Sequence, residues 1–158
     1  MFFRGGRCHF NTPFRKNVGV PQAQEVPSRS RKSLTVNAND LLDRFVELAP
    51  EFRSNWDSDE NCFIGDDGHF TLHGVCAEFS HFFRDNHEEL SAATMTELFE
   101  FIESNVVEPN APETNLDNAL CTCFLENISS ERCGETAKPF MGRKAREFFD
   151  QWHTGPPY

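Results

Sequence analysis

Four side chains that suit zinc lie close together in the middle of the sequence: Cys62, His69, His73 and Cys76. Thiolate and imidazole are ligands that zinc prefers, and two histidines four residues apart share one face of a helix. Each residue also has an ordinary structural role, because His69 follows an Asp-Asp-Gly turn, His73 flanks a predicted helix and Cys76 belongs to its apolar stripe. We therefore predict no metal or other cofactor, and these four residues are the candidate ligands if zinc is bound.

Enzymatic chemistry has little support in the sequence. Six cysteines and six histidines are enough to pair a thiol nucleophile with a base, but this abundance makes chance pairing common. There is no phosphate-binding glycine loop after a strand and no nucleophile elbow. A calcium loop beginning at Asp57 fails, because Cys62 stands where glycine is needed and Gly68 stands where a bidentate glutamate is needed. We predict a non-enzymatic protein, and the alternative is a small enzyme or zinc-binding protein that uses the Cys/His cluster.

The cysteine positions indicate a reducing compartment. Cys76, Cys121 and Cys123 fall at or beside apolar positions of predicted helices, where a free cysteine behaves as a small hydrophobic side chain. Reduced thiols of this kind are typical of intracellular proteins. No apolar run approaches the roughly 20 residues that a membrane span requires. We predict a cytoplasmic location and no membrane association.

Three glutamates of a predicted helix, Glu97, Glu100 and Glu103, point away from its apolar stripe and are most simply a solvated face. Phe101 lies among them, well away from the centre of the buried side. The leader or a loop covers this ring in one interpretation, whereas in the other it is an exposed aromatic surrounded by carboxylates. An exposed aromatic of that kind would suit a partner interface. These four residues are the predicted partner-binding surface.

Charge divides the chain into two parts. Residues 1–36 hold seven basic side chains and one acidic side chain, a formal charge of +6, whereas residues 37–158 hold eight basic and 24 acidic side chains, a formal charge of −16. The first part lacks the apolar segment of a secretory signal, and its prolines oppose the amphipathic helix of a transit peptide. We predict a disordered basic leader over residues 1–36, or a stretch that precedes the true translation start. Scattered cations bind phosphate weakly, so we do not expect nucleic-acid binding.

From residue 37 onward the apolar residues recur with a helical period. The fourth predicted helix is apolar on two sides and should be central, while Pro50 should kink or restart the first helix. Cys62-Phe63-Ile64 facing His69-Phe70-Thr71 across the Asp-Asp-Gly turn suggests a short hairpin. The sequence predicts an all-α fold, a single compact bundle of about five helices that forms an acidic domain over residues 37–155. Four of the predicted helices cover approximately residues 39–56, 71–86, 114–127 and 139–154. The other begins near Ser91 or Thr94 and ends before Pro109.

The phrase Phe124-Leu125-Glu126-Asn127, followed by a loop and a glycine-containing segment at Met141-Gly142, resembles a family of small bacterial proteins catalogued as a domain of unknown function. The resemblance covers approximately residues 40–153. Some proteins of this style look like immunity proteins, which neutralise a co-encoded toxin by binding it. In physical terms the phrase suits a structural role, with Phe124 in the core and Asn127 ending a helix.

Together these observations predict a protein-interaction domain, and the leading hypothesis is that it neutralises a basic protein partner. A strongly acidic body would speed the capture of a cationic surface more than it would raise affinity. Acidity also serves solubility alone. The position of the charge discriminates between the two, because a continuous acidic patch around an exposed apolar group favours binding.

Overall fold

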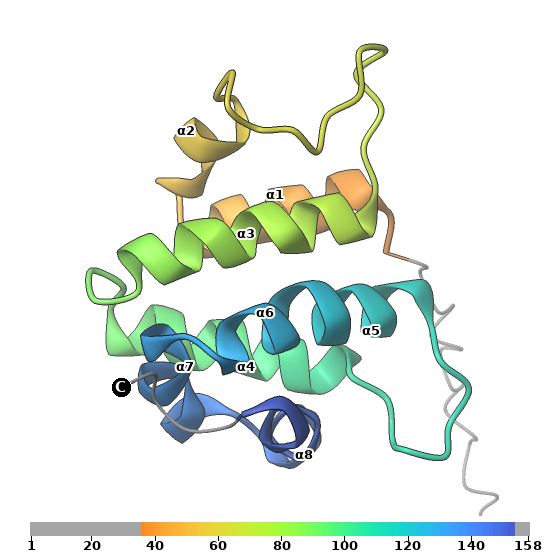
Figure 1. The fold of residues 1–158 in the computed structure, drawn as a ribbon, viewed down its shortest axis with the longest axis vertical. Coiled ribbons are helices and arrows are strands. Elements are labelled where there is room, and N and C mark those ends of the chain that lie inside the picture. Colours follow the sequence, from red (N-terminus) through yellow and green to blue (C-terminus); the bar gives the residue numbers. More distant parts are fainter. Residues whose placement is uncertain (1–35, 154–158) are drawn as a thin grey trace, which may run out of the picture. The chain divides into compact units, whose positions relative to one another are not determined.

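The computed structural model describes residues 36–153, which form a bundle of helices (Figure 1). This range contains no strand, so the predicted all-α class is confirmed. The predicted leader, apart from Val36, and the predicted domain end at residue 155 lie outside the described residues. None of the described helices combines the length and the apolar character needed to cross a lipid bilayer. The α-helices are α1 (Ala38–Leu48), α2 (Phe52–Trp56), α3 (Leu72–Asn86), α4 (Ala92–Asn105), α5 (Asn115–Leu120), α6 (Glu126–Ser129), α7 (Arg132–Ala137) and α8 (Arg143–Trp152).

The first predicted helix is divided at Pro50, as the proline predicts. Helix α1 begins after Asn37, whose side chain accepts hydrogen bonds from the N–H groups of Asn39 and Asp40 while Asp40 accepts from the N–H of Asn37. This reciprocal capping box satisfies backbone donors that have no partner within the helix. The chain turns at Ala49 and Pro50 and resumes as α2.

The predicted hairpin over residues 62–71 is wrong. Residues 57–70 form a run of turns and bends, and the N–H of Gly65 donates to the carbonyl of His69 at 2.9 Å. Gly68 adopts a φ of 78°, which closes the turn at the Asp-Asp-Gly sequence. The flanking residues pack individually: the ring of Phe70 meets Trp56 at a centroid distance of 4.9 Å. No strand ladder forms because each flank anchors to the helices instead of to the other flank.

The fourth predicted helix is one continuous helix from residue 115 to residue 129. It comprises α5, a π-helical turn η1 (Cys121–Leu125) and α6. Thr114 caps its start by accepting from the N–H of Asp117 at 3.1 Å. It packs against α3, α4, α7 and α8, which explains why its apolar residues lie on two sides. The π turn was not predicted, and the helix continues past Asn127, so the predicted end at that residue is wrong.

The last predicted helix, residues 139–154, starts too early: residues 138–140 form the 3₁₀ turn η2 (Lys138–Phe140), and α8 begins only after Gly142. Helix α7 lies before this range and was not predicted. The described residues therefore hold seven helical stretches where about five were expected. The helical period of the last predicted helix places Phe148, Phe149 and Trp152 on its buried side. In the structure Phe149 is buried, but Phe148 is half-buried and Trp152 is 47% exposed.

Phenylalanine accounts for 17 of the 158 residues and builds much of the core. The rings of Phe45 and Phe79 stack at a centroid distance of 4.0 Å, and Phe79 also contacts Phe52, Phe82 and Phe124. These rings come from α1, α2, α3 and the π turn, so one aromatic cluster holds four elements together. Phenylalanine needs no hydrogen-bond partner when it is buried, which allows this cluster to exclude water completely.

Candidate functional site: a carboxylate-lined cleft

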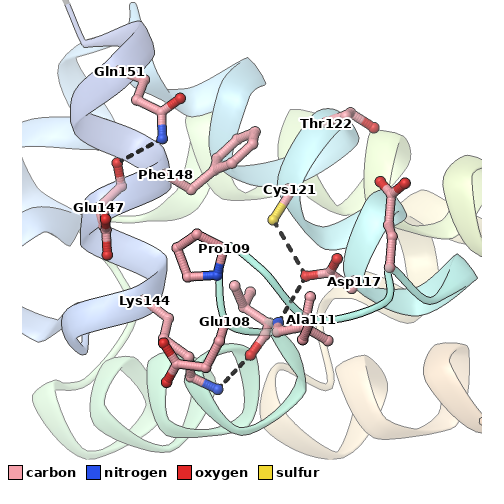
Figure 2. Close-up of a pocket in the computed structure, with 13 residues that line it drawn as sticks. Glu108, Pro109, Ala111, Asp117, Cys121, Thr122, Lys144, Glu147, Phe148 and Gln151 are labelled. Carbon is pink, nitrogen blue, oxygen red and sulfur yellow. Dashed lines mark hydrogen bonds between the residues drawn. The ribbon is translucent and has the colours of Figure 1, made fainter.

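A cleft of about 440 Å³ lies between α8, the start of α5 and the segment of residues 106–113 that joins α4 to α5 (Figure 2). Val107, Pro109, Ala111 and Phe148 give it apolar walls. Lys144 is the only basic side chain among its lining residues. Four carboxylates line the cleft: Glu108, Glu113, Asp117 and Glu147.

One wall is a single face of α8. Lys144, Glu147, Phe148 and Gln151 follow the spacing i, i+3, i+4 and i+7, which brings side chains to the same side of a helix. Gln151 donates from Nε2 to the carbonyl oxygen of Glu147 at 3.1 Å. The helix backbone therefore fixes the positions from which these side chains enter the cleft.

The opposite wall is an irregular segment that two long-range bonds hold in place. The N–H of Val107 donates to Oδ1 of Asp117 at 2.9 Å, which ties the segment to α5. The Nζ of Lys144 donates to the carbonyl of Val106, which ties it to α8. Arg143 adds an exposed ion pair with Glu108. The cleft is thus a product of three elements that meet only in the folded chain.

Asp117 lies at the base of the cleft and is only 6% exposed. Its Oδ1 accepts from the N–H of Val107 and, at 3.7 Å, from the thiol of Cys121 (Figure 2). Within the described part of the chain, its Oδ2 has no hydrogen-bond donor and no basic side chain forms an ion pair with it. Among the described residues only Nε2 of His87 is a buried side-chain polar atom without a partner, so Oδ2 of Asp117 keeps contact with solvent. Because Asp117 lines the cleft, this oxygen is a place where an incoming cation can bind.

Cys121 is not activated by its position in the cleft. Burial raises the pKa of its thiol to about 12, and the neighbouring carboxylate of Asp117 acts in the same direction. A nucleophilic cysteine needs the opposite shift, toward the thiolate. Cys121 therefore stays protonated at neutral pH and donates to Asp117.

An aromatic pair extends along the same helix. Phe148 lines the cleft, and its ring lies 6.4 Å from that of Trp152 one turn later. Trp152 is the one large hydrophobic side chain that is exposed among residues 36–153. Tryptophan is enriched among the residues that dominate binding energy at protein interfaces.

Comparison with known proteins gives one match. The model of a family described as a domain of unknown function, DUF7674, matches residues 39–155. The chain belongs to the DUF7674 family. No curated protein and no solved structure matches it. The predicted membership of a family of this kind is confirmed, and the cleft lies wholly within the part of the chain that the family model covers.

The predicted zinc ligands do not form a cluster. No group of three or more His, Cys, Asp or Glu side chains within residues 36–153 is placed to hold a metal ion. Cys62 and His69 are exposed, and Cys76 is fully buried. His73 instead pairs through Nε2 with Oδ1 of Asn118 at 2.7 Å, which links α3 to α5.

The predicted partner-binding residues have separate environments. Glu97 and Glu100 are exposed on α4. Phe101 packs edge-on against Phe45 at 6.1 Å and lies beneath the guanidinium of Arg44, so α1 covers part of this ring. The predicted cover by the leader lies outside the described residues. Glu103 accepts from the N–H groups of Lys144 and Ala145 and so caps α8. Phe101 is half-buried, whereas the exposed large aromatic among residues 36–153 is Trp152, whose ring lies near that of the cleft residue Phe148.

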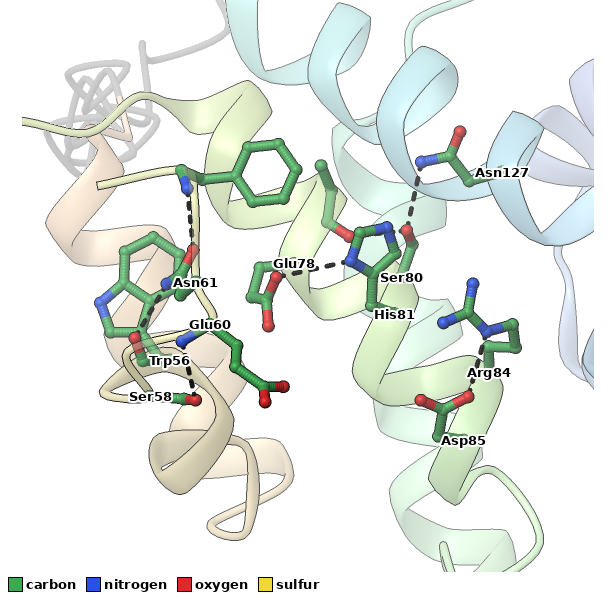
Figure 3. Close-up of polar contacts among 12 residues, drawn as sticks. Trp56, Ser58, Glu60, Asn61, Glu78, Ser80, His81, Arg84, Asp85 and Asn127 are labelled. Carbon is green, nitrogen blue, oxygen red and sulfur yellow. Dashed lines mark hydrogen bonds and ion pairs between the residues drawn. The ribbon is translucent and has the colours of Figure 1, made fainter. Parts of the chain in front are cut away.

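The phrase Phe124 to Asn127 lies in the DUF7674 match and spans the π turn and the start of α6. Phe124 and Leu125 are fully buried, and Glu126 is half-buried. Asn127 donates from Nδ2 to Oγ of Ser80 at 3.1 Å and to the carbonyl of Cys123, which joins α6 to α3 (Figure 3). Nearby on α3, Arg84 pairs with Asp85 and His81 pairs with Glu78. These contacts give the phrase a packing role.

Sequence reasoning missed the cleft. The residues Asp117, Lys144 and Glu147 were not singled out, because each is an ordinary polar residue on a predicted helix. One signal pointed to them: two prolines, Pro109 and Pro112, mark an irregular segment directly before a helix whose first turn carries Asp117. A second signal was the spacing of four residues in the last predicted helix, which places charged side chains and an aromatic ring on one face of that helix: Lys144, Glu147, Phe148 and Gln151.

Proposed function

We propose that this chain is a non-enzymatic protein-interaction domain that binds a basic segment of a partner protein at the carboxylate-lined cleft. The observation that carries the proposal is the cleft itself, which is lined by four carboxylates, apolar walls and a single basic side chain, Lys144. Arg143, outside the lining, pairs with Glu108 and Glu147 and leaves Glu113 and Asp117 without a cationic partner among the described residues. Lysine and arginine side chains combine an apolar stem with a cationic end, so they complement such a lining.

The wider charge of the chain supports this choice of partner. The described residues 36–153 contain eight basic and 24 acidic side chains, a formal charge of −16. A field of this sign attracts cationic proteins and raises the rate of association. Binding that blocks the cationic face of a toxin or a nuclease would neutralise it, and this is the partner class that we favour.

The exposed aromatic residue next to the cleft supports an interface. Trp152 and Phe148 continue the α8 wall beyond the carboxylates. An aromatic anchor beside complementary charge is the usual composition of an interaction surface. Charge would orient the partner, and burial of these two rings would slow its release.

The chemistry of the thiols and histidines supports the non-enzymatic part of the proposal. Burial raises the pKa of the Cys76 and Cys121 thiols, and it raises the pKa of Cys133 to about 11. No histidine lines the cleft. The described cysteines are all free, which suits the reducing environment of the cytoplasm, and we place the function there.

The test is calorimetric titration of the full chain with a lysine-rich peptide at low and at high salt. We expect the double variant Glu113→Gln/Glu147→Gln to weaken binding about tenfold at low salt, because the cleft loses two of its carboxylates. Circular dichroism and urea unfolding would confirm that the variant folds as the parent does.

The matched control is Glu97→Gln/Glu100→Gln, which removes the same charge from the exposed face of α4. It should change affinity less than about twofold, because long-range attraction alone is weakly sensitive to two distant charges. Equal losses in the two variants would mean that attraction to the whole chain explains the binding, and would overturn the cleft as the site. A larger loss in the control would move the site to α4.

A further inference from the structure

Asp117 presents one bound oxygen and one free oxygen at the base of the cleft. Oδ1 accepts from Val107 and Cys121, while Oδ2 has no donor among the residues that the structure describes. This carboxylate is more than nine-tenths buried and lines the cleft. We propose that the cleft receives a single lysine side chain of the partner, whose ammonium group pairs with Asp117. The inference rests on the proposed function and names the partner group that the site selects.

The single free oxygen favours lysine over arginine. A guanidinium group is planar and gains most of its specificity from two parallel bonds to both oxygens of a carboxylate. At Asp117 one of the two oxygens already accepts two bonds from the protein, so that bidentate arrangement is not open. An ammonium group needs only one oxygen here, and it directs its other donors elsewhere.

Two further carboxylates of the cleft come from different elements, and each already has a partner: Glu113 accepts from Nδ2 of Asn118, and Glu147 pairs with Arg143 at 3.3 Å. A carboxylate accepts several hydrogen bonds, so both can still receive a donor from an ammonium group. Glu113 comes from the segment before α5, and Glu147 comes from α8. A compact cation with three rotatable donors matches acceptors on several sides better than a flat fork does. The apolar walls formed by Val107, Pro109 and Phe148 suit the four-carbon stem of lysine.

The chain's own lysine leaves Asp117 available. The Nζ of Lys144 donates to the carbonyl of Val106. The hydrogen bond and charge of Arg143 lower the pKa of Glu108, and the charge of Lys144 acts in the same direction. It forms no ion pair with Asp117 within the described residues. Lys144 therefore neutralises the outer edge of the cleft and not its base.

Two peptides of equal length and charge test the inference, one rich in lysine and the other with arginine at every lysine position. We expect the full chain to bind the lysine peptide at least about fivefold more tightly, since arginine cannot use its bidentate geometry. Acetylation of the lysines should abolish binding, because it removes the charge. In Asp117→Asn, whose side-chain oxygen can still accept from Val107, the preference for lysine should disappear.

The outcomes separate this inference from the proposed function. Equal or tighter binding of the arginine peptide, with both peptides weakened by Glu113→Gln/Glu147→Gln, would overturn the lysine site while the basic-partner function stands. A lysine preference that persists in Asp117→Asn would also overturn it. Absence of binding by either peptide would overturn both. The comparison of the peptides on the unaltered chain needs no variant, so it stands even if Asp117→Asn does not fold.

Discussion

The side chain of Glu103 lies directly against the backbone of Gly142. A Cβ atom at residue 142 would lie 2.4 Å from both Cγ and Cδ of Glu103, which is far inside contact distance. From this position Glu103 accepts from the N–H of Lys144 at 3.1 Å and from the N–H of Ala145 at 2.9 Å. A glutamate of α4 therefore caps α8, and glycine at residue 142 leaves the room for it. The same contact sets the start of the helix that forms one wall of the cleft.

Substitution of Gly142 by alanine should destabilise the protein by displacing this cap. The new methyl group would push the Glu103 side chain away, and we expect a loss of about 1–3 kcal/mol in the free energy of unfolding. The φ of Gly142 is −69°, which alanine adopts readily, so backbone strain is not the cause. Urea unfolding monitored by circular dichroism measures the change.

A double-mutant cycle isolates the contact. Glu103→Ala alone should lower the free energy of unfolding by about 1–2 kcal/mol, because two backbone N–H groups lose their acceptor. Gly142→Ala should then cost less in the Glu103→Ala background than in the parent, since no side chain is left to displace. If the losses of unfolding free energy from the two single substitutions simply add in the double variant, the two residues act independently.

Gly134 on α7 should tolerate alanine even less well. A Cβ atom there would lie 2.3 Å from the carbonyl oxygen of Ile128 and 3.0 Å from Cζ of Phe149. Backbone cannot move aside as a flexible side chain can, so we expect Gly134→Ala to cost about 2–4 kcal/mol in unfolding free energy. Thr136→Ala, at an exposed position of the same helix, is the control and should change stability by less than about 0.5 kcal/mol.

The cysteines should differ sharply in their reaction with iodoacetamide. Burial raises the pKa of Cys121 to about 12 and that of Cys133 to about 11, so the reactive thiolate is scarce below those values. Cys62 is exposed. At pH 8 we expect Cys62 to react at least about tenfold faster than Cys121 and Cys133, as read by peptide mass spectrometry. In urea the rates should converge, and similar rates in the folded protein would contradict the described burial.

The orientation of α8 can be tested by stability alone. Trp152 is 47% exposed, so Trp152→Ala should lower the unfolding free energy by less than about 1 kcal/mol. Phe149 is fully buried, and Phe149→Ala should cost about 3–5 kcal/mol. A large loss for Trp152→Ala would mean that this side chain is buried, as the helical periodicity alone suggested.

Local patterns in the sequence were sufficient for most of the helices. The positions of Phe45, Phe79 and Phe99 in apolar stripes mark buried faces, and Pro50 marks the division of α1 from α2. These features depend on residues that are close in the chain, where backbone geometry and side-chain period act directly. The same reasoning failed at residues 62–71, because a short turn flanked by apolar residues has no local property that separates a hairpin from a loop packed on helices.

The sequence by itself determined an acidic, phenylalanine-rich, all-helical chain, since composition and periodicity are local properties that burial of apolar surface converts into helices. Only the tertiary structure decided where the charges act. Glu103 became a cap for α8, Phe101 was partly covered by α1, and Asp117 met Val107 and α8 at the cleft. Each of these outcomes depends on contacts between residues distant in the chain, whose geometry is fixed by how the helices pack.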